Sequence, residues 1–268
     1  MYCFDVNFDW FCLTWLFSLN RKSAIQEIEH QFDSTIIPYK STINEWINCS
    51  PNQLISSIIE KGANGQTVYE IYHSFTTKLA GLECKQSQKE RVHNKFVEDS
   101  IYVLITNRYF LAIANGFIND PIDIPMVTTP QDVGVIMTPT EIAEILRLDK
   151  IDYQAYLLAL LRLVDTIVEY TTTTVINESV ASTGSKSSNY SIAIINLKIV
   201  SKLQNGFQLL DLKNDVLRKR YDSLKYNSQR LNKIVYDLSL RNLITTKGEV
   251  NWWLCFCPNY LIQFYSFL

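Results

Sequence analysis

A short basic cluster in the first half of the sequence consists of residue types that can bind phosphate groups. Its residues are Lys89, Arg91, His93 and Lys95, interrupted by Glu90. An arginine can hold a phosphate through two parallel hydrogen bonds, and a histidine can stack on a base or donate a hydrogen bond to it. Alternate residues on a helix point about 200° apart. Arg91 and His93 can therefore line one channel only at the start of a helix or where the channel surrounds the helix. We expect this cluster to contact nucleic acid.

A second basic cluster lies between Asp211 and Arg241. This stretch has eight basic and four acidic residues, a net charge of +4, whereas the 268-residue chain has a net charge of −2. A local positive field is enough to attract a single strand. The candidate binding residues here are Arg218, Lys219, Arg220 and Lys225. The alternative is a solvated helix face on which Asp211 and Asp215 pair with neighbouring cations.

Asp165 and Glu169 lie one helical turn apart and are weak candidates for a catalytic site. Metal-dependent hydrolysis of RNA needs several carboxylates that converge on one point, because they must fix and neutralise divalent ions. Two carboxylates do not complete such a set, so we expect no metal or other cofactor in this chain. The six cysteines form no C-x-x-C pair, and no P-loop, dinucleotide-binding or Ser/His/Asp signature is present.

The elements that carry these residues are predicted to be helices. Ser50-Pro51-Asn52-Gln53 and Thr138-Pro139-Thr140-Glu141 each place a hydroxyl at the N-cap and proline at the first helical position. The fourth residue of each motif can reach back to the cap. The predicted helices span 51–61, 92–117, 139–147 and 153–173. The threonine run at 171–174 weakens the last of them toward its end.

The composition, 47% hydrophobic and 19% charged, is that of a globular protein. We expect one helical domain over 24–245, between an apolar N-terminal extension, 1–23, and an aromatic tail, 246–268. Two irregular segments are predicted inside the domain, at 119–138 and 181–191. The apolar run from Trp10 to Leu19 is shorter than the ~20 residues that span a bilayer, so we expect no membrane segment.

Five leucines recur at seven-residue intervals near the end of the chain. They are Leu210, Leu217, Leu224, Leu231 and Leu238. Such a stripe stays on one face when the helix packs into a long groove. We favour the core face of a helical bundle over a two-stranded coiled coil. The positions four residues further on are poorer than in a strict zipper; these are Asn214, Tyr221, Ser228 and Val235.

The residues around these leucines resemble the C-terminal region of the translin family. The resemblance is carried by Gly206-Phe207, Leu209 to Asp215, Leu217 to Asp222, Leu224 to Tyr226, Ile234 to Ser239, and Arg241. Arg91-Val92-His93-Asn94-Lys95 also resembles the family's R-x-H-x-H nucleic-acid motif, with Lys95 in place of the second histidine. In outline the resemblance covers 24–245, and the two irregular segments look like insertions.

This resemblance implies an all-α, single-domain bundle of about seven helices that assembles into closed, barrel-like oligomers, typically octamers. It also implies binding of single-stranded RNA and DNA, and we expect a cytoplasmic and nuclear location. The family's partner, translin-associated factor X, supplies the Mg²⁺-dependent ribonuclease site of a joint complex in RNA silencing and tRNA processing.

The catalytic partner's metal-binding acids correspond to positions of this chain that cannot hold a metal. By resemblance, those positions are Tyr102, Ile105, Ala159 and Leu163. We therefore expect a non-catalytic scaffold subunit of the translin type. Two alternatives remain: a self-sufficient ribonuclease that uses Asp165 and Glu169 in a shifted register, and a helical module that binds an acidic protein.

Overall fold

The computed structural model describes six segments of the chain. They are residues 6–50, 53–54, 65–114, 135–181, 190–212 and 216–244, with the backbone alone described for 6–22, 65–67 and 181. These segments contain seven helices and no strand, which confirms the expected all-α class. Within the described helices, none combines the length and the apolar character needed to cross a membrane.

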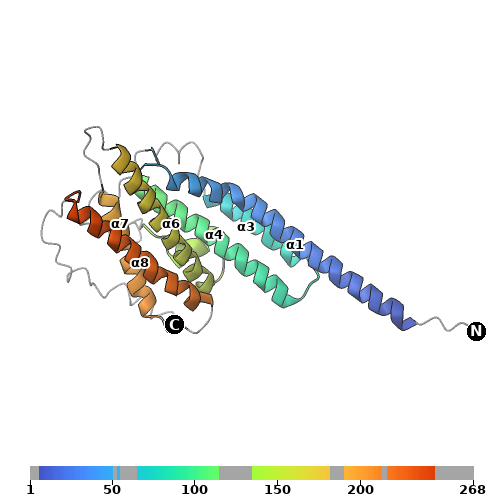
Figure 1. Ribbon diagram of the computed structural model, residues 1–268. Helices are drawn as coiled ribbons and strands as arrows, with labels where there is room; N and C mark the ends of the chain where they lie inside the picture. Colours follow the sequence, from blue (N-terminus) through green and yellow to red (C-terminus); the bar gives the residue numbers. More distant parts are fainter. Residues whose placement is uncertain are drawn as a thin grey trace, which may run out of the picture. The chain divides into compact units, whose positions relative to one another are not determined.

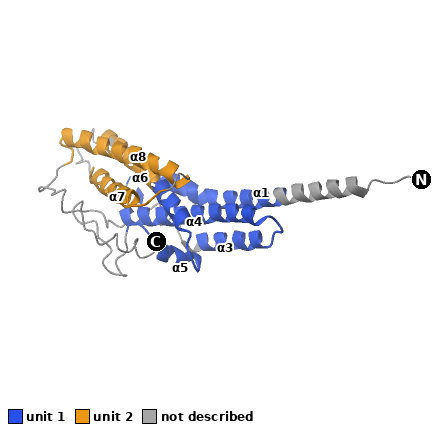
Figure 2. Cartoon of the chain, turned by 90° about the horizontal axis from the view of Figure 1, so that it is seen from below, with its two compact units in different colours: residues 1–115, 133–163 blue, residues 116–132, 164–268 orange. Residues whose placement is uncertain are grey.

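The helices follow one another in a simple order along the chain (Figure 1). They are α1 (Val6–Ile47), α3 (Gly65–Ala80), α4 (Gln86–Ala114), α5 (Pro139–Leu146), α6 (Tyr153–Ala181), α7 (Ser191–Gln208) and α8 (Val216–Leu240). The chain divides into two compact units (Figure 2). Unit 1 is residues 1–115 and 133–163, and unit 2 is residues 116–132 and 164–268.

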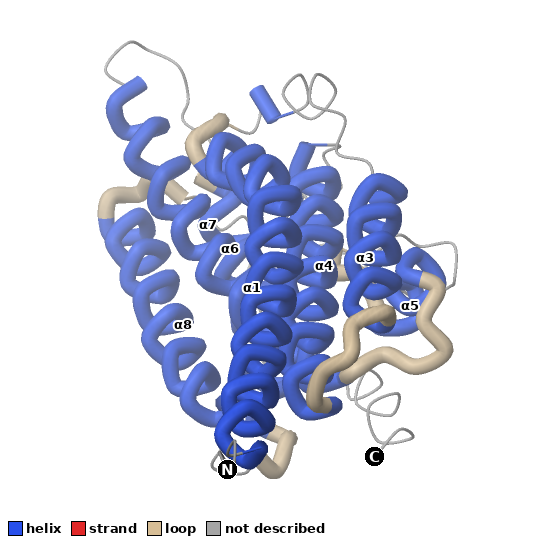
Figure 3. The backbone as a smooth tube through the Cα atoms, turned by 90° about the vertical axis from the view of Figure 1, so that its right-hand side faces the viewer, coloured by secondary structure: helices blue, strands red, loops and turns tan. Residues whose placement is uncertain are grey.

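In unit 1, α1, α3 and α4 lie side by side (Figure 3). Aromatic side chains form the core between them. The rings of Phe32 and Phe96 stack with centroids 4.1 Å apart, and Phe75 of α3 meets Phe32 edge-on at 5.5 Å. Both stacked rings are fully buried. Burial of rings this large contributes strongly to stability. The stack also fixes the register of α1 against α4, because neither ring can slide without opening a cavity.

A buried ion-pair cluster centred on Asp99 links three helices of the same unit. Asp99 of α4 is 4% exposed, and its Oδ1 lies 3.0 Å from Nζ of Lys40 and 2.6 Å from a guanidinium nitrogen of Arg162. Burial lowers the pKa of Arg162, but the hydrogen bond and charge of Asp99 outweigh that effect, and the net pKa is raised. Removing one partner of a buried ion pair typically costs about 3–5 kcal/mol. Asp99 therefore ties α1 and α4 to the first part of α6.

The capping motifs form as expected where the structure describes them. Thr138 Oγ1 accepts from the backbone N–H of Glu141 at 3.3 Å, and the Glu141 carboxylate accepts from the Thr138 N–H at 2.6 Å. Both halves of this capping box start α5. At the other motif, the Ser50 N–H donates to Gln53 Oε1 at 3.2 Å. Most of the helix predicted over 51–61 lies outside the described residues.

Two predicted helix boundaries are wrong. The helix predicted from Val92 begins six residues earlier, at Gln86. The helix expected to end near Thr173 continues to Ala181. Thr171 and Thr172 donate their hydroxyls to the carbonyls four residues back, and Asn196 of α7 donates to Thr171 Oγ1 at 2.8 Å. This buried contact with α7 offsets the weak helix propensity of the threonines.

The other expectations for irregular segments and chain ends lie mostly outside the described residues. Residues 115–134 and 182–189, and those before 6 or after 244, are not described. The backbone of 6–22, within the predicted N-terminal extension, belongs to α1.

Unit 2 pairs α7 with α8 in opposite directions. Phe207, near the end of α7, stacks on Tyr221, near the start of α8, with ring centroids 6.0 Å apart. At the other end, Leu238 packs with Tyr190 and Ala193. Four leucines of the seven-residue repeat are buried on α8: Leu217, Leu224, Leu231 and Leu238. The inclusion of Leu210 was wrong, because this half-buried residue lies in the turn after α7.

We predict that Leu231→Ala lowers the free energy of unfolding by about 2–5 kcal/mol, because the side chain is fully buried. Leu240→Ala, on the same helix but 64% exposed, should change it by no more than about 0.5 kcal/mol. Urea unfolding followed by helical circular dichroism measures both. Equal losses for the two variants would contradict the described packing of α8.

Candidate nucleic-acid interface

Two residues of the basic cluster on α4 face α3. Lys89 Nζ donates to the carbonyl of Ala80 at 2.9 Å, and so caps the last turn of α3. His93 Nε2 shares a hydrogen bond of 3.1 Å with the Tyr72 hydroxyl. Burial raises the pKa of Tyr72 to about 12, so this hydroxyl stays protonated at neutral pH. Lys89 and His93 therefore join two helices of unit 1.

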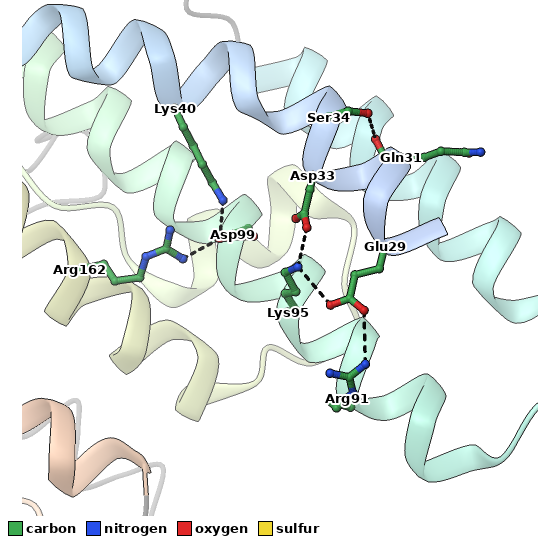
Figure 4. Close-up of polar contacts among 9 residues, drawn as sticks. All are labelled: Glu29, Gln31, Asp33, Ser34, Lys40, Arg91, Lys95, Asp99 and Arg162. Carbon is green, nitrogen blue, oxygen red and sulfur yellow. Dashed lines mark hydrogen bonds and ion pairs between the residues drawn. The ribbon is translucent and has the colours of Figure 1, made fainter. Parts of the chain in front are cut away.

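The other two residues of this cluster face α1 (Figure 4). Arg91 lies 3.3 Å from Glu29 Oε2, and Lys95 Nζ lies 3.1 Å from Glu29 Oε1 and 2.8 Å from Asp33 Oδ2. Burial lowers the pKa of Lys95, but the hydrogen bonds and charges of Asp33 and Glu29 together outweigh it, and the net pKa is raised. Two cations thus meet two carboxylates, and the local charge is balanced.

The structure therefore separates this cluster onto two faces, as the 200° spacing of alternate helical residues requires. Arg91 and Lys95, four residues apart, share one face, and His93 lies on the other. Their acidic partners were not foreseen, because Glu29 and Asp33 lie 62 residues away along the chain from Arg91 and Lys95 respectively. Local spacing contains no signal for that pairing.

Three of the four residues predicted on α8 also have contacts within unit 2. Arg220 lies 3.7 Å from Asp165 Oδ2, and Lys225 lies 3.8 Å from Asp222 Oδ1. The cationic groups of Arg218 and Lys225 lie 5.7 and 5.3 Å from the ring centroid of Tyr221. These contacts place the three cations along the flanks of α8, near its packed side.

The outward face of α8 presents a different set of side chains. It consists of Lys219, Tyr226, Arg230 and Lys233, all exposed. Their spacing of seven, four and three residues places them in one line along the helix, opposite the buried leucines. Within the described part of the chain, none of the three cations forms an ion pair or a side-chain hydrogen bond. Tyr226 is 71% exposed. We call this set the outer α8 face.

Of this set, Lys219 was predicted from the sequence as a binding residue, whereas Tyr226, Arg230 and Lys233 were not. The leucine repeat in the sequence could have identified these three residues as outward-facing. The leucines at 217, 224 and 231 fix which side of α8 points inward, so the residues half a turn away from them must point outward. α8 has six basic and two acidic residues, a net charge of +4, so the remainder of the chain sums to −6.

The carboxylates proposed for catalysis do not assemble into a metal site within the described residues. Asp165 accepts a hydrogen bond from Asn227 Nδ2 at 2.6 Å and also lies beside Arg220. No group of three or more histidine, cysteine or acidic side chains with metal-binding geometry occurs in those residues. The corresponding positions from the catalytic partner are packed in the core: Tyr102, Ile105, Ala159 and Leu163.

Comparison with known proteins gives one family. The model of the Translin family matches residues 66–242, about two thirds of the chain. Translin of Gallus gallus is 57% identical over 44 residues, which cover 16% of this chain and 19% of that protein. Translin of Homo sapiens is 57% identical over 42 residues, 16% of this chain and 18% of that protein. The matched stretch thus spans about a fifth of the length of these curated relatives.

We predict that the purified chain leaves a single-stranded RNA 24-mer intact in Mg²⁺ or Mn²⁺. The reason is that the Asp165 carboxylate already forms an ion pair with Arg220 and accepts a hydrogen bond from Asn227. Cleavage is measured by gel electrophoresis of the end-labelled strand, and the variants Asp165→Asn and Glu169→Gln are assayed in parallel. Metal-dependent cleavage that either substitution abolishes would show that this pair is catalytic.

Proposed function

The chain belongs to the translin family, and from that premise we propose that it binds single-stranded nucleic acid through the outer α8 face. The observation that carries this proposal is the exposed line of Lys219, Tyr226, Arg230 and Lys233 on the most basic helix of an acidic protein. The three cations supply charge for phosphates, and the exposed ring supplies a surface on which a base can stack.

The physical chemistry of this face matches a single strand. Phosphates release counterions when cations neutralise them, which gives affinity without sequence preference. An aromatic side chain on which a base stacks is worth about 1–3 kcal/mol per base. Tyr226 lies between Lys219 and Arg230 along the helix, so one strand can place a base on the ring and phosphates on both sides. A paired duplex hides its base faces and gains only the charge term.

The basic cluster on α4 differs from the outer α8 face in that its side chains already have partners within the protein. Its cations are already paired with carboxylates or helix ends, so a strand must displace those partners first. We therefore assign the first contact to α8 and regard Arg91, His93 and Lys95 as a second contact.

Family membership supports the remaining part of the proposed function. We propose that this chain is the non-catalytic, nucleic-acid-binding scaffold subunit of a complex with translin-associated factor X, which would supply the Mg²⁺-dependent ribonuclease site. A cytoplasmic and nuclear location and a role in RNA processing belong to the same proposal.

We predict that Arg230→Glu with Lys233→Glu weakens binding of a single-stranded 24-mer at least tenfold at low salt. The slope of log affinity against log salt should also flatten by about 1.4, since each phosphate contact on a single strand contributes about 0.7. Fluorescence anisotropy at several salt concentrations measures both quantities. Lys150→Glu with Lys202→Glu makes the same charge change at exposed lysines elsewhere and should have a smaller effect.

A second substitution separates stacking from charge. Tyr226→Ala should weaken single-strand binding about tenfold with an unchanged salt slope, because it removes a ring and no charge. Tyr236→Ala, at another exposed tyrosine of α8, is the control. If the parent binds polyglutamate but no single strand, the function is protein interaction and the nucleic-acid proposal fails.

Family membership and exposed apolar side chains on α6 and α8 support assembly into a closed homo-oligomer. Ile176, Val180, Val216 and Leu240 are each more than half exposed. Apolar surface of this kind is buried when copies associate. We predict a mass several times 31.0 kDa by light scattering after gel filtration at micromolar concentration. A monomer mass would contradict the prediction of a closed oligomer.

A further inference from the structure

We propose that Glu29 and Asp33 of α1 occupy the phosphate positions on Arg91 and Lys95, and so set the affinity and salt dependence of the α4 contact. This inference rests on the proposed nucleic-acid-binding function. In this arrangement the chain carries its own competing anion, and a strand binds at α4 by exchanging with two carboxylates.

The contacts have the form of an occupied anion site. Glu29 and Asp33 lie one helical turn, about 5.4 Å, apart on α1, and Arg91 and Lys95 have the same spacing on α4. Glu29 bridges both cations, with one oxygen on each, and Asp33 makes the shortest contact, 2.8 Å, to Lys95. Figure 4 shows the four side chains pointing toward one another between the two helices.

The positions of the carboxylates are set by the core beneath them. Phe32 precedes Asp33 and Phe96 follows Lys95, and these two rings form the 4.1 Å stack that fixes the register of α1 on α4. The two acids are therefore held opposite the two bases whether or not the ion pairs form. A substitution that removes their charge leaves this register in place.

The pairs can exchange without unfolding. The side chain of Arg91 is 69% exposed and that of Lys95 is 37% exposed, so an incoming phosphate can reach both. A guanidinium has five N–H donors, and the ion pair of Arg91 with Glu29 uses one of its nitrogens. Asp99 provides the contrast within the same unit: its side chain is 6% exposed between Lys40 and Arg162, so an external ion cannot replace it.

The two acids also lie outside the part of the chain that matches the family. Residues 66–242 include Arg91 and Lys95, whereas Glu29 and Asp33 precede them. The competing carboxylates are thus supplied by a segment that the family match does not cover.

The test is a gain of binding in the 268-residue chain. Glu29→Gln with Asp33→Asn keeps the side-chain shapes and removes two negative charges. Single-strand affinity should rise about fivefold to tenfold at low salt. The salt slope should steepen by up to about 1.4, because Arg91 and Lys95 become available to phosphates. Glu27→Gln with Glu70→Gln removes two charges from exposed positions away from these cations, and should change affinity less than twofold.

A variant cycle makes the assignment specific. In a background of Arg91→Gln with Lys95→Gln, removal of the Glu29 and Asp33 charges should no longer raise affinity, because contacting groups couple and distant ones do not. If the parent binds single strands with a salt slope but the Glu29/Asp33 variant matches its control, this inference is overturned and the proposed function stands. If neither the parent nor any variant binds single strands at low salt, both fail.

Discussion

The buried carboxylate of Asp99 is the interaction on which the arrangement of unit 1 depends. A charge that is 4% exposed is tolerated because Lys40 and Arg162 neutralise it from two other helices. Together with the Phe32–Phe96 stack, it holds α1 against α4 in a single register. The polar contacts nearer the surface, between α1 and the start of α4, form because that register has already brought their residues together.

The cations of this protein therefore differ in what they can do. Arg162 and Lys40 are structural, because the carboxylate that they share, Asp99, is buried and each of them neutralises it from another helix. Arg91 and Lys95 are paired but exposed, so another anion can take the place of their carboxylates. Lys219, Arg230 and Lys233 form no ion pair among the described residues, and they lie before and after the exposed ring of Tyr226 along α8. A polyanion can therefore bind Lys219, Arg230 and Lys233 without displacing another anion. At Arg91 and Lys95 it must first displace Glu29 and Asp33.

The parts of the structure that could be predicted from sequence are those with local causes. Thr138 and Glu141 are close enough in the chain to cap a helix together, and the leucine repeat defines the inner side of α8. Translin-like residues in the C-terminal half correctly indicated the family. The rest depends on distant partners: Asn196 supports the threonine run of α6 from another helix, and Glu29 meets Arg91 across 62 residues. Tyr226 had a readable signal, its phase opposite the leucines, and was overlooked.

The central claim is that single strands bind at the outer α8 face. Its most direct test is the acylation of lysines in the unmodified protein, read by peptide mass spectrometry with and without a saturating single-stranded 24-mer. We predict that the strand slows modification of Lys219 and Lys233 severalfold and leaves Lys150 and Lys202, which are also exposed, unchanged. Equal reactivity of Lys219 and Lys233 in the free and saturated protein would contradict the claim.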